Sequence, residues 1–300
     1  MCSKFYKVSK VGSIHESVDS FLLPRGLSIP VNSCNGLLAF PKYEWTKHKL
    51  SVHIWNPLTR KRTRHPPNRD LHVCGWITYH RDFSNFRTCG LGYDSILNEY
   101  KIIAFLGSET VVCTIGSTSW RHVKEVPFVP LKKKFSIYLN GTLYWFASAQ
   151  KIEGIGSFGI GNEKFGFVAF PTEVIGKFGF ELSVLGGCLC LIEYESRENV
   201  IVWALKKRCD GGGEEVWIKQ FVLSMPNNCR QLSILYAFNN GEILLMSKVY
   251  DETRWIVKCV YYDPKNNRYR DDQTFISSFP SEPKVSAIVH VGSLVSLSQR

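Results

Sequence analysis

Short hydrophobic runs alternate with polar residues along this chain, and turn-forming pairs end the runs. In the clearest stretch, the pair Asn35-Gly36 precedes an apolar run from Leu37 to Phe40, and a second run alternates over residues 51–55 before Asn56-Pro57. Asn-Gly tolerates the positive φ that a tight hairpin requires, while proline removes a ladder donor and restricts the residue before it. This stretch therefore predicts two hairpin strands, a polar loop and a third strand that ends in a turn.

Similar punctuation recurs down the whole chain. Glycines of the predicted turns stand at positions 36, 92, 141, 187, 241 and 292, about 50 residues apart. A period of about 50 residues with four short strands in each unit is typical of kelch-type propellers. The sequence therefore predicts an all-β fold, a kelch-like β-propeller of six blades with four antiparallel strands each. A β-sandwich or a pair of small β domains is the alternative.

The expected domain organisation is an N-terminal segment, residues 1–30, followed by a propeller domain over residues 31–300. A propeller closes when its last blade combines strands from both ends of the chain. The candidates for this closing blade are Ser20 to Val31 and Val285 to Leu297.

Composition agrees with a folded domain, and its positive charge permits an acidic partner or nucleic acid. Of its 300 residues, 44% are hydrophobic and only 21% are charged, and these fractions exclude a disordered chain. The net charge is +11. The ten cysteines are scattered without a C-x-x-C pair, and the N-terminal residues lack an apolar signal-peptide core. We therefore expect reduced thiols and a cytoplasmic or nuclear protein. No apolar run approaches the length of about 20 residues that crosses a membrane.

Enzymatic motifs are weak or absent in this sequence. Residues 154–159 match G-x-G-x-x-G, but a turn and another strand follow in place of the helix that phosphate binding needs. His72, Cys74, His80 and Cys89 do not have the spacing of a common zinc site. Neither a G-x-S-x-G elbow nor H-E-x-x-H is present. We therefore predict no enzymatic activity, no cofactor and no metal.

Partner binding is expected in loops whose length departs from the repeat: Pro41 to Lys49, Arg64 to Phe86 and Lys206 to Glu215. Aromatic residues in polar loops are common at binding hot spots. The predicted partner-binding residues are Trp45, Trp76, His72 and His80. The basic run from Arg60 to Arg69 is read as a charged, solvated edge strand, with phosphate contact as the alternative. No aromatic platform stands beside it to stack bases, so nucleic acid is not an expected partner. A membrane is not expected either, because no apolar run is long enough to cross one.

Nine motifs in order resemble the plant F-box-associated interaction domain. They are S-C-N-G-L-L, I-W-N-P-L-T-R-K, G-L-G-Y-D-S with E-Y-K-I, S-T-S-W-R, Y-L-N-G-T-L-Y-W, L-S-V-L-G-G-C-L-C-L, V-W-A-L-K, Y-Y-D-P and S-L-V-S-L. The resemblance runs from about Val31 to the end of the chain.

This resemblance implies the substrate-recognition part of an F-box protein, which serves an SCF-type ubiquitin ligase. The implied partners are a target protein and, only where an F-box lies upstream, a Skp-type adaptor and a cullin. Residues 1–30 contain no leucine- and proline-marked helical segment of the F-box kind. The alternatives are an F-box-less paralogue that binds partners without ubiquitylation, and a small-ligand or sugar-binding propeller.

Overall fold

The structure is a computed structural model. It describes residues 4–11, 15–22, 29–44, 49–65, 71–72, 86–106, 109–117, 119–123, 125–131, 136–177, 179–196, 198–207, 215–226, 228–270 and 274–283, with single positions at 288, 290 and 294. The chain divides into two units, one formed by residues 26–170 and 290–300 and the other by residues 1–25 and 171–289.

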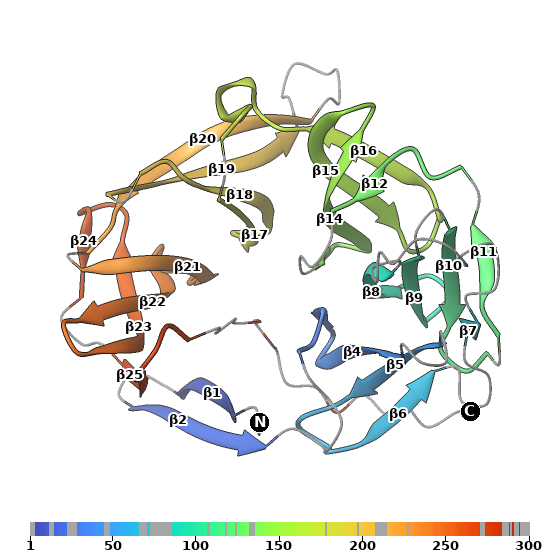
Figure 1. Ribbon diagram of the computed structural model, residues 1–300, viewed down its shortest axis with the longest axis horizontal. Helices are drawn as coiled ribbons and strands as arrows, with labels where there is room; N and C mark the ends of the chain where they lie inside the picture. Colours follow the sequence, from blue (N-terminus) through green and yellow to red (C-terminus); the bar gives the residue numbers. More distant parts are fainter. Residues whose placement is uncertain are drawn as a thin grey trace. The chain divides into compact units, whose positions relative to one another are not determined.

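Three antiparallel sheets make up the unit of residues 26–170 and 290–300 (Figure 1). The first contains β3 (Asn32–Cys34), β4 (Leu37–Glu44), β5 (Lys49–Trp55), β6 (Arg62–His65) and β7 (Leu71–His72). The second contains β8 (Phe86–Asp94), β9 (Glu99–Leu106), β10 (Glu109–Thr114) and β11 (Arg121–Val123). The third contains β12 (Val129–Pro130), β13 (Ile137–Leu139), β14 (Thr142–Ala149), β15 (Ile152–Gly159) and β16 (Phe165–Ala169).

The other unit has one hairpin and two larger sheets. The hairpin pairs β1 (Lys4–Val11) with β2 (His15–Leu22). One sheet contains β17 (Phe180–Leu185), β18 (Cys188–Tyr194), β19 (Asn199–Lys207) and β20 (Glu215–Ser224). The last contains β21 (Cys229–Ala237), β22 (Ile243–Asp251), β23 (Arg254–Asp263), β24 (Arg268–Tyr269) and β25 (Thr274–Phe279). The 3-10 turn η2 (Thr172–Val174) precedes β17, and no helix in the described part of the chain is long and apolar enough for a membrane crossing.

Strand β9 shows why neighbouring sheets stack. Successive side chains of a strand point to opposite faces. Ile102 and Ala104 belong to a buried cluster shared with the β3–β6 sheet, whereas Ile103 and Phe105 belong to a cluster shared with the β12–β16 sheet. Both faces of the middle sheet are therefore covered, each by a different neighbour, as in consecutive blades of a propeller.

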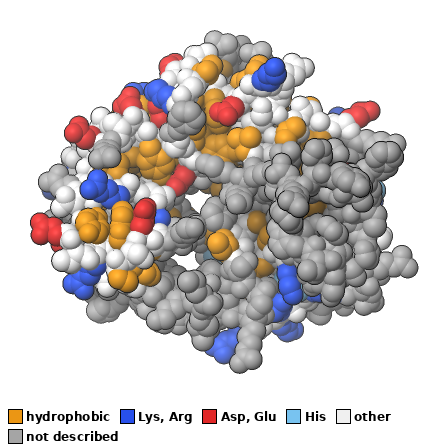
Figure 2. All heavy atoms as spheres, viewed as in Figure 1, with side chains coloured by type: hydrophobic (Ala, Val, Ile, Leu, Met, Phe, Trp, Pro, Cys, Tyr) orange, Lys and Arg blue, Asp and Glu red, His pale blue; other side chains and the backbone are white. Residues whose placement is uncertain are grey.

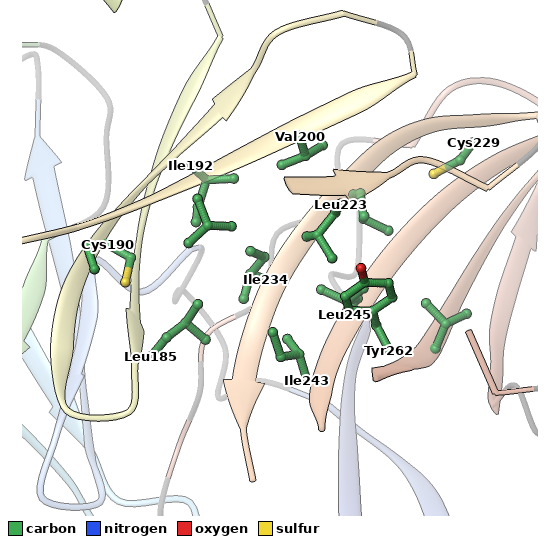
Figure 3. Close-up of a cluster of buried hydrophobic side chains, with 14 residues drawn as sticks. Leu185, Cys190, Ile192, Val200, Leu223, Cys229, Ile234, Ile243, Leu245 and Tyr262 are labelled. Carbon is green, nitrogen blue, oxygen red and sulfur yellow. The ribbon is translucent and has the colours of Figure 1, made fainter. Parts of the chain in front are cut away.

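The same packing joins the two larger sheets of the other unit. Ile192 on β18 and Val200 on β19 face Leu232 and Ile234 of β21 across a cluster of buried side chains. Figure 3 labels Ile192, Val200 and Ile234 in this cluster. Because the cluster is drawn from both sheets, neither sheet buries this face alone.

Polar side chains join edge strands of adjacent sheets. Asn32 on β3 bonds both backbone groups of Leu91 on β8, since its Nδ2 donates to the Leu91 oxygen at 2.7 Å and its Oδ1 accepts from the Leu91 N–H at 3.0 Å. The Ser136 hydroxyl donates to the Cys89 oxygen. Ser183 on β17 donates in the same way to Ile234 on β21. The partners lie 59, 47 and 51 residues apart, so each bond spans about one repeat.

The all-β prediction with blade-like antiparallel sheets is confirmed, and the blade count differs. Among the described residues, five sheets have four or five strands, and the hairpin β1–β2 has two. Six four-stranded blades were expected because six glycines were counted as turn markers. Gly292, the last of them, lies outside the described residues. The closing blade and the domain boundary at residue 31 stay predictions, because residues 23–28 and most of the tail also lie outside.

One turn glycine was misassigned. Asn35-Gly36 and Asn140-Gly141 have positive φ at all four positions, as expected for hairpin turns. Gly92 instead lies inside β8, where an added Cβ would stand 2.3 Å from Cδ1 of Ile160. Gly92 therefore allows two sheets to pack closely, and the turn falls at residues 95–98.

The G-x-G-x-x-G match is a strand, as the preferred interpretation held. Residues 154–159 lie within β15. A Cβ at Gly154 would stand 2.3 Å from the Val168 oxygen on β16, and one at Gly156 would stand 2.5 Å from the Phe128 ring. Close packing therefore accounts for these glycines.

Candidate interaction surface

The predicted partner-binding residues fall largely outside the described part of the chain. Trp45, Trp76 and His80 lie outside it. His72 ends β7, where it pairs with Lys49 of β5. Most of the three predicted contact loops also lies outside, so the roles proposed for these residues stay predictions.

The described turn between β8 and β9 presents two exposed aliphatic side chains. Ile96 is 88% exposed and Leu97 is 60% exposed. Asp94 is buried beneath them, and its Oδ1 accepts hydrogen bonds from the N–H groups of Ile96 at 3.0 Å and Leu97 at 3.1 Å. Asn98 completes the turn with a φ of 57°. Such a side-chain cap fixes the turn backbone, so the two aliphatic side chains project from a rigid base.

An ionic network supports this turn from below. The nearly buried Nζ of Lys101 lies 3.5 Å from Asp94 Oδ2 and 3.0 Å from Glu163 Oε1, and it donates to the Ile160 oxygen at 3.1 Å. Arg121 bonds both oxygens of Glu163. Lys101 belongs to β9, while Glu163 lies in the turn before β16, so the network joins two sheets.

The network determines the charge states of its carboxyl groups. Hydrogen bonds from the Leu97 and Ile96 N–H groups and the charge of Lys101 outweigh desolvation and hold the pKa of Asp94 below its usual value. Burial alone would raise the pKa of Glu163. Hydrogen bonds and charge from Arg121 and Lys101 lower it by a larger amount, so the pKa lies below its usual value. Both carboxylates are ionised at neutral pH and are neutralised internally.

A second capped turn stands at the same strand end of the adjacent sheet. Asn56 Oδ1 accepts from the N–H groups of Leu58 at 2.9 Å and Thr59 at 3.2 Å, and Arg60 has a φ of 59°. Leu58 is 55% exposed. In an antiparallel sheet whose strands follow chain order, the first and third turns lie at the same strand end. The β8–β9 turn is the first of its sheet and the β5–β6 turn is the third of its own, while the side chain of Asn35, in the β3–β4 turn, bonds Tyr100 beside the β8–β9 turn.

We call the turns 35–36, 56–61, 94–99 and 160–164 the turn surface. The last of them adjoins the Asp94 turn, since a Cβ at Gly161 would stand 3.5 Å from Asp94 Oδ1. The turn surface thus combines rigid backbone with exposed aliphatic side chains, which is the property expected of a protein-binding surface.

The other unit contains a shallow depression of about 560 Å³ on the β17–β20 sheet. Two tryptophans, two isoleucines, three glutamates and two lysines line it. The carboxylate of Glu193 is fully buried there, and it accepts from Trp203 Nε1 at 2.8 Å and Lys177 Nζ at 2.5 Å. The hydrogen bond with Glu193 raises the pKa of Lys177. In the view of Figure 2, hydrophobic and charged side chains are interspersed over β17–β20 and β21–β25.

Most of the described cysteines are buried, which makes them poor nucleophiles. Seven of them are free thiols, and six of these are buried. Burial raises the pKa of Cys190 to about 12 and that of Cys229 to about 11, and it raises the pKa values of Cys34 and Cys89 as well. These thiols stay protonated at neutral pH and are inert. Among the described residues, no group of three or more His, Cys, Asp or Glu side chains is placed to hold a metal ion.

The described part of the basic run, residues 60–64, forms a turn and an edge strand as predicted, whereas Arg69 lies outside the described residues. Arg62 and Arg64 are exposed on β6, which ends its sheet in the order β3-β4-β5-β6. Arg60 and Lys61 are exposed in the preceding turn. The charge therefore protects an edge strand, and it also borders the turn surface.

The β8–β11 sheet, whose two faces are covered by successive neighbours, indicates a propeller-type protein, and the family comparison agrees. A family model described as "F-box associated beta propeller domain" matches residues 8–279. The chain therefore belongs to the family of F-box associated β-propeller domains. This confirms both the predicted fold class and the resemblance drawn from the sequence motifs.

Curated relatives come from Arabidopsis thaliana. The F-box/kelch-repeat protein At3g23880 is 29% identical over 69% of this chain and 56% of its own length. F-box protein At4g22390 is 22% identical over 62% of this chain and 51% of its own. Putative F-box protein At3g16590 is 27% identical over 96% and 83%. The chain thus spans about half the length of the first two relatives.

Proposed function

We propose that this chain is the target-binding domain of an F-box-type substrate receptor for an SCF ubiquitin ligase. The observation that supports this most directly is the family match over residues 8–279. Relatives described as F-box proteins, in which the matched region is only part of the length, favour the same function. A rigid set of sheets that displays exposed apolar turns suits selection of a protein target.

In this proposal the chain performs recognition and not chemistry. A receptor needs only to hold its target near the ligase, so neither a cofactor nor a metal is required. A Skp-type adaptor and a cullin are partners of whichever form of the protein carries an F-box. The buried free thiols favour a cytoplasmic or nuclear setting.

The test is affinity capture of the tagged product of the full-length transcript from plant cells after proteasome inhibition, with the amounts of adaptor, cullin and bound proteins measured. A receptor is expected to capture a protein whose half-life lengthens when the gene for this chain is deleted, together with adaptor and cullin. Capture of a stable protein whose half-life does not change, with no adaptor or cullin, would instead establish a binding paralogue outside the ligase and refute the receptor function.

A further inference from the structure

The turn surface exposes aliphatic side chains where turns usually have polar ones. Ile96, Leu97 and Leu58 are each more than half exposed, whereas Ile102 and Ile54 on the adjoining strands are fully buried. The exposed surface of Ile96, Leu97 and Leu58 therefore contributes nothing to the stability of the free chain. Exposed apolar groups gathered at one end of a domain mark a surface that a partner covers.

Positive charge borders these aliphatic side chains. Arg60, Lys61 and Lys164 are exposed at the same strand end, and Arg121 is half exposed. The acidic groups there are mostly neutralised, because Asp94 and Glu163 are held by Lys101, Arg121 and backbone N–H groups. Glu99 is exposed. The surface thus offers apolar contact surrounded by an excess of cations.

We infer that the turn surface binds a polypeptide segment in which acidic residues alternate with aliphatic ones, and that this segment belongs to the target of the proposed receptor. Its aliphatic side chains cover Ile96, Leu97 and Leu58, and its carboxylates meet Arg60, Lys61 and Lys164. Because the two capped turns are already fixed, little backbone entropy is lost at the surface when the segment binds. The inference rests on the proposed function only for the origin of the segment.

The charge pattern would also attract nucleic acid, but the apolar pattern does not fit it. Single strands are held by aromatic side chains on which bases stack. The exposed groups at the tips of the two capped turns are aliphatic. A protein segment uses both the apolar and the cationic features, and an oligonucleotide uses only the second.

The probe is a short fluorescein-labelled peptide in which Glu and Leu alternate, checked to be monomeric. Its binding to the purified chain is followed by fluorescence anisotropy at several salt concentrations. Two comparison peptides replace Glu by Lys, or Leu by Ser. A single-stranded DNA oligonucleotide labelled in the same way is the fourth probe.

Two double variants separate the two contributions. Ile96→Ser with Leu97→Ser removes aliphatic contact and is expected to weaken the Glu-Leu peptide by about tenfold or more. Arg60→Glu with Lys61→Glu is expected to weaken it by up to about fivefold for each charge and to reduce its salt dependence. All four positions are exposed, and far-ultraviolet circular dichroism checks that each variant is folded.

A matched control lies at the other end of the strands in the same unit. Ile152 is 53% exposed and Lys151 is exposed in the turn between β14 and β15. Ile152→Ser with Lys151→Glu removes one aliphatic and one cationic group away from the turn surface. This variant is expected to bind the peptide as the parent chain does.

The inference is supported if the Glu-Leu peptide is the only one of the four probes that binds, and if both turn variants weaken this binding while the control variant does not. Equal loss in the control variant, absence of peptide binding, or oligonucleotide binding that depends on Arg60 and Lys61 but not on Ile96 overturns it. Since the receptor function is tested by target half-life and by adaptor capture, failure of the peptide leaves that function standing.

Discussion

Asn32 offers a sharp test of how adjacent sheets are joined. Its carboxamide is 3% exposed and bonds both the N–H and the oxygen of Leu91. β8 ends its sheet in the order β11-β10-β9-β8, so these backbone groups point away from β9. Asn32 therefore replaces the ladder partner that an edge strand lacks.

The size of the effect follows from the number of groups left unpaired. Asn32→Ala removes the partners of two buried backbone groups, and each such group costs about 1–3 kcal/mol. The expected loss in free energy of unfolding is therefore about 2–6 kcal/mol. Ser136→Ala removes one of two donors to a single carbonyl, that of Cys89, which also accepts from the Thr88 hydroxyl at 3.4 Å. An under-satisfied carbonyl is tolerated better than an orphaned N–H, so its effect should be less than half as large.

Asn32→Asp provides the diagnostic comparison. An ionised carboxylate accepts from the Leu91 N–H but has no proton to donate to the Leu91 oxygen, and it is buried. The protonated carboxyl group restores both bonds. Burial raises the pKa of such a group in the folded state, so its neutral form stabilises the variant at low pH, and this stability is lost as the pH rises through the folded value.

Urea unfolding at pH 7 and at pH 4, with m-values compared among variants, measures these differences. Asn32→Asp should be strongly destabilised at pH 7 and recover relative to the parent chain at pH 4. The reasoning fails if Asn32→Ala costs no more than Ser136→Ala, or if Asn32→Asp shows no relative recovery in acid.

Three further predictions use the same unfolding assay. Gly92→Ala should destabilise the chain because its Cβ would stand 2.3 Å from Cδ1 of Ile160. The double variant with Ile160→Ala should lose less free energy of unfolding than the two single variants together. Strictly additive losses would argue against a clash. The pKa of Glu163 is lowered from 4.5, so its contribution to stability is present above pH 4.5 and is lost as the pH falls through the lower folded value. Glu163→Gln should accordingly flatten the acid limb of the stability curve, and an unchanged limb would contradict this. Lys177→Met leaves the buried Glu193 carboxylate without its cation. This single variant should therefore lose more free energy of unfolding than the double variant with Glu193→Gln. Equal losses in the two variants would mean that Glu193 is not desolvated.

The strands and hairpin turns were readable from the sequence because their signals are local. Asn140-Gly141 predicts a turn, since both residues adopt positive φ at small cost, and both do so here. Gly92 shows the limit of such a signal. A glycine is also required where another sheet approaches the backbone, and only the packing of Ile160 separates the two cases.

The turn surface also has a local signal in the sequence. In both capped turns an Asn or Asp stands four residues before a residue with positive φ, as Asn56 before Arg60 and Asp94 before Asn98. An aliphatic residue inside such a pattern indicates an exposed apolar side chain. The Lys101–Glu163 pair carries no local signal, because these residues are 62 positions apart and meet only when two sheets pack.

The predicted anchors rest on a different signal, because aromatic residues in long polar loops are common at binding sites. Trp45, Trp76 and His80 lie outside the described residues, so this signal stays untested. Buried tryptophans differ in whether the indole N–H has an acceptor. That of Trp203 donates to Glu193. Trp145 is also buried, but no described group accepts a hydrogen bond from its indole N–H.

The alternation along β9 has a consequence for how such domains tolerate changes in length. Inserting or deleting one residue in that strand would exchange the positions of Ile103 and Ala104, and would thereby misfit two hydrophobic clusters at once. Length differences between relatives should therefore accumulate in the connections and be rare in the middle strands. Diversity in recognition would then arise from loops that grow and shrink around sheets of constant register.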